Sequence, residues 1–258
     1  NGGAISAYFS TLTLDNSGTN VNNRLGGPNR AVNLNGGELV IIGNVSAPTT
    51  ETIHSAGVPN VGILTFGNGN SRLTLQPNAA QPLTLSIGRL GDQTGAETGL
   101  IRGTGLGNAP GNGVATVLNI GNVQLIGGGT GDGSTQIGIR PDILGDTNAV
   151  GLGTGFLTYS TGRGFRPLTS AELAPGLFRA FATNSNVAVS ASTLFGTATV
   201  NSLTLNAGSS FTGISNVAQL TSSSGGILVF DASGGFSGGL VNTGSAQLFF
   251  HQLDTVNA

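Results

Sequence analysis

The stretch with the clearest potential for chemistry is residues 235–239, which read Gly-Phe-Ser-Gly-Gly. This order matches the G-x-S-x-G pattern of the nucleophile elbow, which needs a strand before the serine, a helix after it and a later histidine. His251 does follow, but the residues after 239 carry no helix signal. Because the chain contains 45 glycines, one such match is expected by chance, and we predict a turn here.

Acidic residues and histidines are the other groups that could act as catalysts or metal ligands. A zinc site needs three or four protein ligands, whereas the chain has only His54 and His251 and no cysteine. Glycan hydrolysis or elimination needs clustered carboxylates, and Asp142 and Asp146 are a pair that could meet near a loop. We interpret both as turn residues. The sequence therefore predicts no catalytic residue, no metal site, no cofactor and no enzymatic activity.

Residues 128–132, Gly-Gly-Thr-Gly-Asp, are similar to the calcium-binding nonapeptide of some β-helices. The aspartate comes one residue too early and the motif does not repeat, so we predict a turn, with an isolated calcium loop as the alternative. Thr-x-Thr phrases at 11–13 and 197–199 fit an ice-binding row, but two phrases do not make an array. Residues 44–46, Asn-Val-Ser, form a lone glycosylation sequon.

Composition excludes several classes of partner. Charged residues are 8% of the chain, the net charge is -2, and all nine basic residues are scattered arginines. A nucleic-acid or basic membrane-surface contact requires a basic patch, which is absent from this sequence. No apolar run is long enough to cross a membrane. The chain begins with asparagine and lacks methionine, so we expect a processed product or a segment of a longer chain.

The elements that would carry any site are short strands. Leu-Thr-Leu occurs at 12–14, 73–75, 83–85 and 203–205. In an extended strand the two leucines share one face and the threonine takes the other. We predict strands with an apolar inner face and a small polar outer face, separated by turns.

Three stretches are expected to differ from these strands. Asn-Gly-Gly at 35–37 favours positive φ and a tight reversal. Residues 48–59 are polar, which indicates a loop outside the regular layer. Thr169 and Glu172 fit a capping box, and Pro175 limits the helix that follows, so we predict one short helical turn within 168–174.

Apolar rungs recur about every 20–25 residues, a spacing typical of one coil of a solenoid. A sandwich or barrel would carry more aromatic residues than the 5% present and longer strands. We therefore predict an all-β fold, a right-handed parallel β-helix (β-solenoid) with loop insertions. It forms a single domain over residues 1–258, with 140–181 as an insertion or decoration.

The ends of such a solenoid matter, because an uncapped coil exposes unpaired amides and carbonyls. Residues 1–8 and 253–258 carry no charged or helical cap, and we place the contacts in residues 1–14 and 240–258. We expect both ends to join more of the same chain or another copy of it. The residues that we assign to this assembly interface are Ala4, Ile5, Tyr8, Phe9, Leu12, Leu14, Leu240, Leu248, Phe249 and Phe250.

Residues 30–39, 200–208 and 224–230 resemble the autotransporter-associated β-strand repeat, and 156–169 is similar to an insert in very large bacterial surface proteins. The resemblance implies an exported, β-helical protein that is adhesive or structural, located outside the cell or on its surface. The family has no general catalytic residues to carry over. Any autotransporter-style export would rest on parts outside this segment.

These observations lead to one functional hypothesis and two alternatives. We expect a structural segment or subunit of a bacterial surface fibre that self-associates end to end. The first alternative is a passenger that binds cell-surface or matrix glycans through 140–181, and the second, less favoured, is a glycan-active enzyme. We expect this segment neither to bind nucleic acid nor to insert into a membrane.

Overall fold

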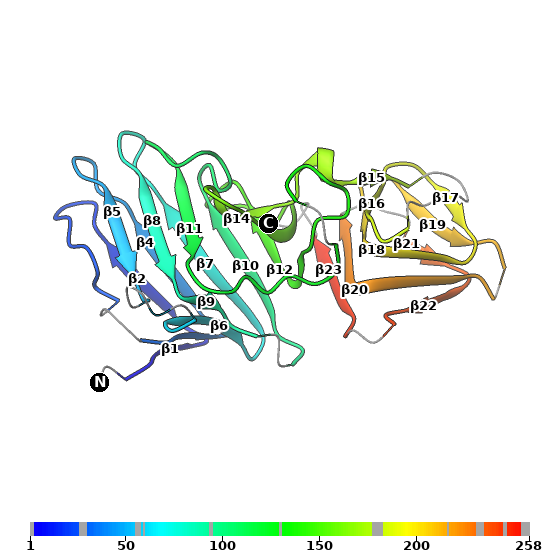
Figure 1. The fold of residues 1–258 in the computed structure, drawn as a ribbon, viewed down its shortest axis with the longest axis horizontal. Helices are drawn as coiled ribbons and strands as arrows, with labels where there is room; N and C mark the ends of the chain where they lie inside the picture. The colour runs from blue at the N-terminus through cyan, green and yellow to red at the C-terminus, as the bar shows by residue number, and fades with distance from the viewer. Residues whose placement is uncertain are drawn as a thin grey trace. The chain divides into compact units, whose positions relative to one another are not determined.

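The computed structural model describes residues 3–25, 30–54, 58, 60–92, 95–128, 131–176, 183–215, 217–230, 235–244 and 247–253. The described chain is all-β with mostly parallel sheets and no α-helix, which confirms the predicted class. Its contacts divide it into two compact units, which are taken separately below (Figure 1). Unit 1 comprises Asn1–Gln124 and Asp142–Pro167, and unit 2 comprises Leu125–Pro141 and Leu168–Ala258. The prediction of one domain over 1–258 stays a prediction.

Unit 1 contains three sheets over its described residues. Sheet A has the order β1 (Ile5–Tyr8), β3 (Val32–Asn35), β6 (Ile63–Gly67) and β9 (Arg89–Leu90). Sheet B has the order β2 (Thr11–Asp15), β4 (Glu38–Ile42), β7 (Asn70–Gln76), β10 (Thr98–Gly103), β12 (Arg140–Asp146), β13 (Gly155–Ser160) and β14 (Gly164–Pro167). Sheet C has the order β5 (Thr49–Thr52), β8 (Leu83–Ile87) and β11 (Ala115–Asn119).

The chain visits these sheets in a fixed order. After β3, β4 and β5 in sheets A, B and C, it returns through β6, β7 and β8 to the same three sheets (Figure 1). Pairing is parallel, and Leu39 lies opposite Leu73, which lies opposite Ile101. All three side chains are fully buried, as the Leu-Thr-Leu alternation predicts. Each such leucine contributes on the order of 2 kcal/mol.

Two expectations about turns and loops are wrong. Gly36 has the predicted positive φ, 68°, but the chain there turns a corner from sheet A to sheet B and makes no reversal. The Gly36 amide donates across to the Gly67 carbonyl and to the Ser71 hydroxyl, both at 3.0 Å. Residues 48–59 contain strand β5, which the sequence hides because its inward residues are Thr49 and Glu51.

Strands β12, β13 and β14 lie within the segment that we expected to be an insertion, and they continue sheet B. β13 and β14 pair antiparallel, unlike the strands before them. Phe165 is buried, and its ring meets that of Tyr159 edge to face with centroids 5.0 Å apart. Residues 140–181 therefore divide between the two units, and 177–181 lie outside the described residues.

Unit 2 contains two sheets over its described residues. Sheet D has the order β15 (Ala174–Pro175), β16 (Asn186–Val189), β18 (Ala198–Leu205), β20 (Gln219–Phe230) and β22 (Leu240–Asn242), and β23 (Phe249–Leu253) also pairs with β20. Sheet E has the order β17 (Thr193–Phe195), β19 (Ser210–Gly213) and β21 (Gly235–Ser237). A 3-10 turn, η1 (Ser170–Glu172), precedes β15.

The predicted helical turn is present in this shorter form. The Thr169 amide donates to the Glu172 carboxylate at 2.9 Å, as one half of a capping box does. Glu172 is buried and also accepts the Gly133 amide at 2.9 Å. The turn is therefore fixed to the segment that begins unit 2.

Aromatic rings form a column inside unit 2. The rings of Phe195 and Phe211 stack in parallel with centroids 4.3 Å apart, and Phe236 meets Phe211 edge to face at 5.8 Å. Phe211 pairs in register with Phe236, so strand pairing places the rings one above another. Both Phe195 and Phe211 are buried.

A polar column lies in sheet D, where β18 shifts register next to Asn201. Asn201 is fully buried, and its side-chain amide donates to Asn186 Oδ1 at 2.8 Å. The Asn186 side-chain amide donates in turn to the Ile137 carbonyl at 2.9 Å. The hydroxyls of Ser222 and Ser224 donate to the Asn201 carbonyl. Asparagine ladders of this kind satisfy buried backbone groups that no strand reaches.

Asn201→Ala is expected to lower the free energy of unfolding of unit 2 by about 1–3 kcal/mol, because it removes a buried donor from a satisfied network. Asn206→Ala is the matched control and should cost about 0.5 kcal/mol or less, since the Asn206 side-chain amide donates only to the exposed Ser190 hydroxyl among the described contacts. Urea unfolding of the two variants measures the difference. Equal losses would contradict the role of the column.

Candidate functional site

Two strand edges are open at one end of unit 1. β1 and β2 are the outermost strands of sheets A and B, and no described strand pairs with their outer sides. Ile5 and Leu12 face inward in register with Val32 and Leu39, yet both are only half-buried. An edge that presents free amides, free carbonyls and uncovered core residues is a template for a further strand.

The third edge at this end, on β5, is covered by residues 20–25, which we call the end loop. The Asn23 amide donates to the Thr50 carbonyl at 3.0 Å, and the Thr50 amide donates to Asn22 Oδ1 at 2.9 Å. The Asn20 side-chain amide donates to the Pro48 carbonyl at 2.9 Å. Asparagine side chains and backbone thus replace the strand that would otherwise lie beside β5.

Asn44 anchors the chain that leads into the end loop. Its buried side-chain amide donates to the carbonyls of Asn16 at 2.7 Å and Gly18 at 3.0 Å. Its Oδ1 accepts the amides of Ser46 at 2.8 Å and Ala47 at 3.0 Å. Both ends of the Asn44 side chain are therefore engaged in holding two loops together.

A buried carboxyl lies beneath the end loop. Glu51 is 0% exposed, and its Oε2 accepts the Leu25 amide at 3.0 Å. Its Oε1 is 4.0 Å from Arg24 Nε. Burial raises the pKa of the Glu51 carboxyl, while the Leu25 backbone amide, the Arg24 guanidinium and the Arg24 backbone amide act in the opposite direction. The site therefore favours a neutral carboxyl.

Unit 2 also has open edges. β21 and the pair β22 and β23 are outermost in sheets E and D, and no described strand covers their outer sides. Phe250 continues the inward row of Leu203 and Ile227 but is 51% exposed, and Val241 continues the row of Leu220 but is 43% exposed. These inward side chains lack the next layer that buries their predecessors.

The residues predicted for the assembly interface fall on these edges or beside them. Those that are exposed are Ala4, Tyr8, Phe9, Leu240, Leu248 and Phe250. Those that are half-buried or buried are Ile5, Leu12, Leu14 and Phe249. Within the predicted contact segments, residues 1–2, 245–246 and 254–258 lie outside the described residues. Their role in assembly stays a prediction.

The residues with the chemistry of an elbow do not form one in the described chain. Ser237 ends strand β21, and its hydroxyl shares a hydrogen bond of 2.9 Å with the Thr212 hydroxyl. The next element is strand β22, where an elbow requires a helix. His251 Nε2 lies 2.8 Å from the Pro141 carbonyl. The stretch 235–239 is a strand followed by a turn.

Acidic residues likewise hold loops. Asp146 accepts the amides of Asn148 at 2.8 Å and Gly153 at 2.9 Å, as a turn residue does. Asp142 and Asp146 are both buried in β12. No group of three or more potential metal ligands occurs among the described residues. The calcium-like stretch 128–132 is only partly described, since 129–130 lie outside the described residues.

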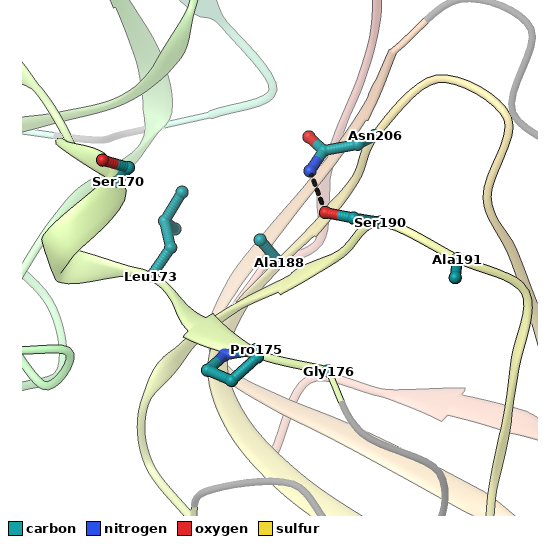
Figure 2. A pocket seen from close by; sticks show the side chains of 8 residues that line it. All are labelled: Ser170, Leu173, Pro175, Gly176, Ala188, Ser190, Ala191 and Asn206. Atoms are coloured by element: carbon teal, nitrogen blue, oxygen red, sulfur yellow. Dashed lines mark hydrogen bonds between the residues drawn. The ribbon is translucent and has the colours of Figure 1, made fainter.

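A shallow hollow of about 450 Å³ lies in unit 2. Ser170 and Leu173 bound one side, and Ser190 and Asn206 bound the other, where the Asn206 amide donates to the Ser190 hydroxyl at 2.8 Å (Figure 2). The lining residues are Ser170, Leu173, Pro175, Gly176, Ala188, Ser190, Ala191 and Asn206. None of these is charged or aromatic, so the lining has no aromatic ring on which a sugar could stack.

Comparisons with protein-family models, with curated proteins and with solved structures found no match for this chain. Among the described residues, no helix is long and apolar enough to cross a membrane. The candidate site is therefore argued from the strand edges and the end loop themselves.

The predicted contact segments contain β1, β22, β23 and most of β2, but sequence reasoning missed the end loop and Glu51. The signal that could have found the loop is the density of asparagine, at positions 16, 20, 22 and 23, where side-chain amides can imitate a strand. Glu51 had no such signal, because a glutamate between two threonines is typical of an exposed loop.

Proposed function

We propose that each unit is a segment of a right-handed parallel β-helix, in which one pass through its sheets is one coil. Support comes from the return of β3, β6 and β9 to one sheet in parallel register. Right-handed crossovers are the general rule for parallel strands. In unit 2 the stacking of Phe195 on Phe211 and of Leu203 on Ile227 supports the same proposal.

The proposed function is structural and non-enzymatic: the chain is a segment or subunit of an extracellular fibre on a bacterial surface. Its mechanism is coil-on-coil pairing across open ends. The observation that carries it is the set of open edges, β1 and β2 in unit 1 and β21 to β23 in unit 2, with inward apolar residues uncovered. The added coil comes from the same polypeptide or from a second copy.

The chemistry of the chain agrees with this role. Low charge and the absence of lysine leave few groups to repel a stacked neighbour. The extracellular location rests on the resemblance of 30–39 and 200–208 to the autotransporter-associated repeat. Self-association is the partner interaction that these features favour.

Electron microscopy of the purified chain at neutral pH tests the proposal. Thin filaments with an axial repeat of about 4.8 Å, the spacing between strands, are the expected result. Discrete particles at high protein concentration would contradict end-to-end stacking. They would direct attention to glycan and surface binding through 140–181.

The double variant Ser6→Pro/Thr13→Pro is expected to abolish filaments while unit 1 stays folded. Ile5 and Phe9 donate to the Ala31 and Asn35 carbonyls of the neighbouring strand, so the Ser6 amide between them faces the open side. Asn16 donates to the Ile42 carbonyl, which by the same alternation turns the Thr13 amide outward. Proline removes each outward donor.

A matched control is Asn33→Pro in β3, a strand paired on both sides. This variant should destabilise unit 1 itself, because it removes a donor from an existing ladder. Circular dichroism and filament counts separate the two effects. Filaments that persist in Ser6→Pro/Thr13→Pro would show that assembly does not use the β1 and β2 edges.

A further inference from the structure

Unsatisfied buried polar atoms are concentrated in unit 1. Among the described residues, every buried side-chain nitrogen or oxygen without a hydrogen-bond partner belongs to this unit, and the residues concerned are Asn16, Arg24, Arg30, Glu51 and His54. Buried polar groups are normally satisfied, so a cluster of exceptions calls for an explanation. Two of these residues, Arg24 and Glu51, lie on either side of the contact between the end loop and β5.

The Arg24–Glu51 pair is poorly matched for its burial. The separation of 4.0 Å between Arg24 Nε and Glu51 Oε1 is too long for a hydrogen bond. Arg24 Nε and Nη2 and Glu51 Oε1 therefore lack partners in the described structure. A buried ion pair compensates for desolvation only when its geometry is good. An ionised Glu51 is poorly stabilised here.

We propose that Glu51 is a pH-operated latch that holds the end loop on β5 when its carboxyl is protonated and releases the loop when it is ionised. The proposal rests on the proposed function, because the end loop is what prevents a further strand from pairing with β5. Release would add a third open edge to those of β1 and β2. A neighbouring coil could then pair with all three sheets.

The charged surroundings of Glu51 are simple. Within the end loop Arg24 is the charged residue, and its guanidinium also acts on the exposed Asp15 carboxylate. In β5 itself the neighbours are threonines, with His54 three positions further on. Strand β8, which pairs with β5, has no titratable side chain and places Leu85 opposite Glu51. Glu51 is thus the acid whose ionisation changes the charge beneath the loop.

The direction of the effect follows from linkage. Below the ordinary glutamate pKa of about 4.5, the carboxyl is neutral in both the closed and the open loop, and its contribution to closure is complete. Burial raises the pKa of Glu51 in the closed state, so the open loop loses its proton first as the pH rises. Closure therefore weakens as the pH rises through the raised value.

Amide hydrogen exchange of the unmodified chain, followed from about pH 4 to about pH 8 and corrected for intrinsic rates, tests the latch. The reporters are the amides of Asn23, Leu25 and Thr50, which bond across the loop contact. Their protection should fall as Glu51 ionises, about tenfold for each unit by which closure of the loop raises the pKa of the carboxyl. Amides in β7 and β8 should keep their protection.

Two variants identify the group responsible. Glu51→Gln keeps an acceptor for the Leu25 amide but cannot ionise, so the loop should stay protected at every pH. Arg24→Gln removes the cation that favours ionised Glu51, so the midpoint should move to higher pH. Should Glu51→Gln fail to fold, the Arg24→Gln shift still decides the matter. Protection that is independent of pH, or a Glu51→Gln profile like that of the unmodified chain, would overturn the latch.

Filament counts over the same pH range keep the two proposals apart. An absence of filaments at every pH would refute end-to-end stacking and leave the exchange result standing. Filaments without any pH-dependent exchange of the loop would refute the latch and leave stacking through β1 and β2 standing.

Discussion

Replacing Gly62 with alanine is expected to unfold much of unit 1. Gly62 has φ +83°, and a Cβ there would overlap the Ile53 carbonyl and lie 2.8 Å from the His54 Cα, both backbone groups that no rotamer change can move. The left-handed conformation costs an alanine about 1–2 kcal/mol. Overpacking against backbone adds about 3 kcal/mol. A total near 4–5 kcal/mol is a large part of the stability of a small domain.

Alanine variants of two other glycines separate the cost of the left-handed conformation from the cost of overpacking. Gly162, also in unit 1, has φ +86° with nothing described within 4 Å of a Cβ, so Gly162→Ala should cost only the conformational part. Gly88 has no positive φ, but its Cβ would overlap the Val61 carbonyl, so Gly88→Ala should report the close approach alone. Thermal unfolding with exchange read over β5 and β6 measures all three. A Gly62→Ala loss no larger than that of Gly162→Ala would contradict the packing described at this corner.

Phe211→Ala is expected to produce the largest loss in unit 2, about 3–5 kcal/mol, the usual cost of removing a buried phenylalanine. The ring is fully buried, and it contacts both Phe195 and Phe236 in the aromatic column. Its removal leaves a void between the rings of Phe195 and Phe236. Exchange should accelerate in β17, β19 and β21, with unit 1 amides serving as an internal reference.

Phe250→Ala is the matched control for this prediction. Its ring lies 6.4 Å from Phe236 at the end of the same column but is 51% exposed. The loss of stability should therefore be about 1 kcal/mol or less in the isolated chain. Comparable losses for Phe211→Ala and Phe250→Ala would mean that the column does not stabilise unit 2 through burial.

Strand positions could be predicted from the sequence wherever alternation is strong. Leu73, Leu75, Leu83 and Leu85 all face inward and are fully buried, because a period of two is a local property of an extended chain. Thr74 and Thr84 take the other face of their strands, where Thr84 is half-buried and Thr74 is buried, with its hydroxyl bonded to Glu38 and Arg102. The all-β class follows from the same signal, with little aromatic content and almost no helix signal.

The arrangement of those strands is less accessible to sequence. At 35–37 the Asn-Gly pair favours positive φ, which Gly36 has. Whether the chain then reverses or turns a corner depends on the strand with which the next segment pairs. Likewise, Val32 pairs with Leu64 and Glu38 with Arg72, a longer repeat than predicted, because loops of unequal length separate the strands. Pairing across such distances is decided by tertiary packing.

In the candidate site too, some features could be predicted from the sequence and others could not. Exposed Tyr8 and Phe9 could be assigned to an edge from their place near an uncapped segment. The inward position of Glu51 could not, because β5 offers no apolar alternation and a charged residue is a poor candidate for a core. Its contacts form only when the fold brings Arg24 and Leu25 of the end loop next to it.

The engagement of Asn44 has a consequence for post-translational processing. Residues 44–46 form an acceptor sequence for N-linked sugar, and the atom that would carry the sugar is the side-chain nitrogen that bonds the Asn16 and Gly18 carbonyls. A transferase that meets the folded chain finds this nitrogen buried. A glycan attached during synthesis would instead block closure of the two loops. In a host that glycosylates secreted chains, modification and correct folding of this segment would therefore be mutually exclusive.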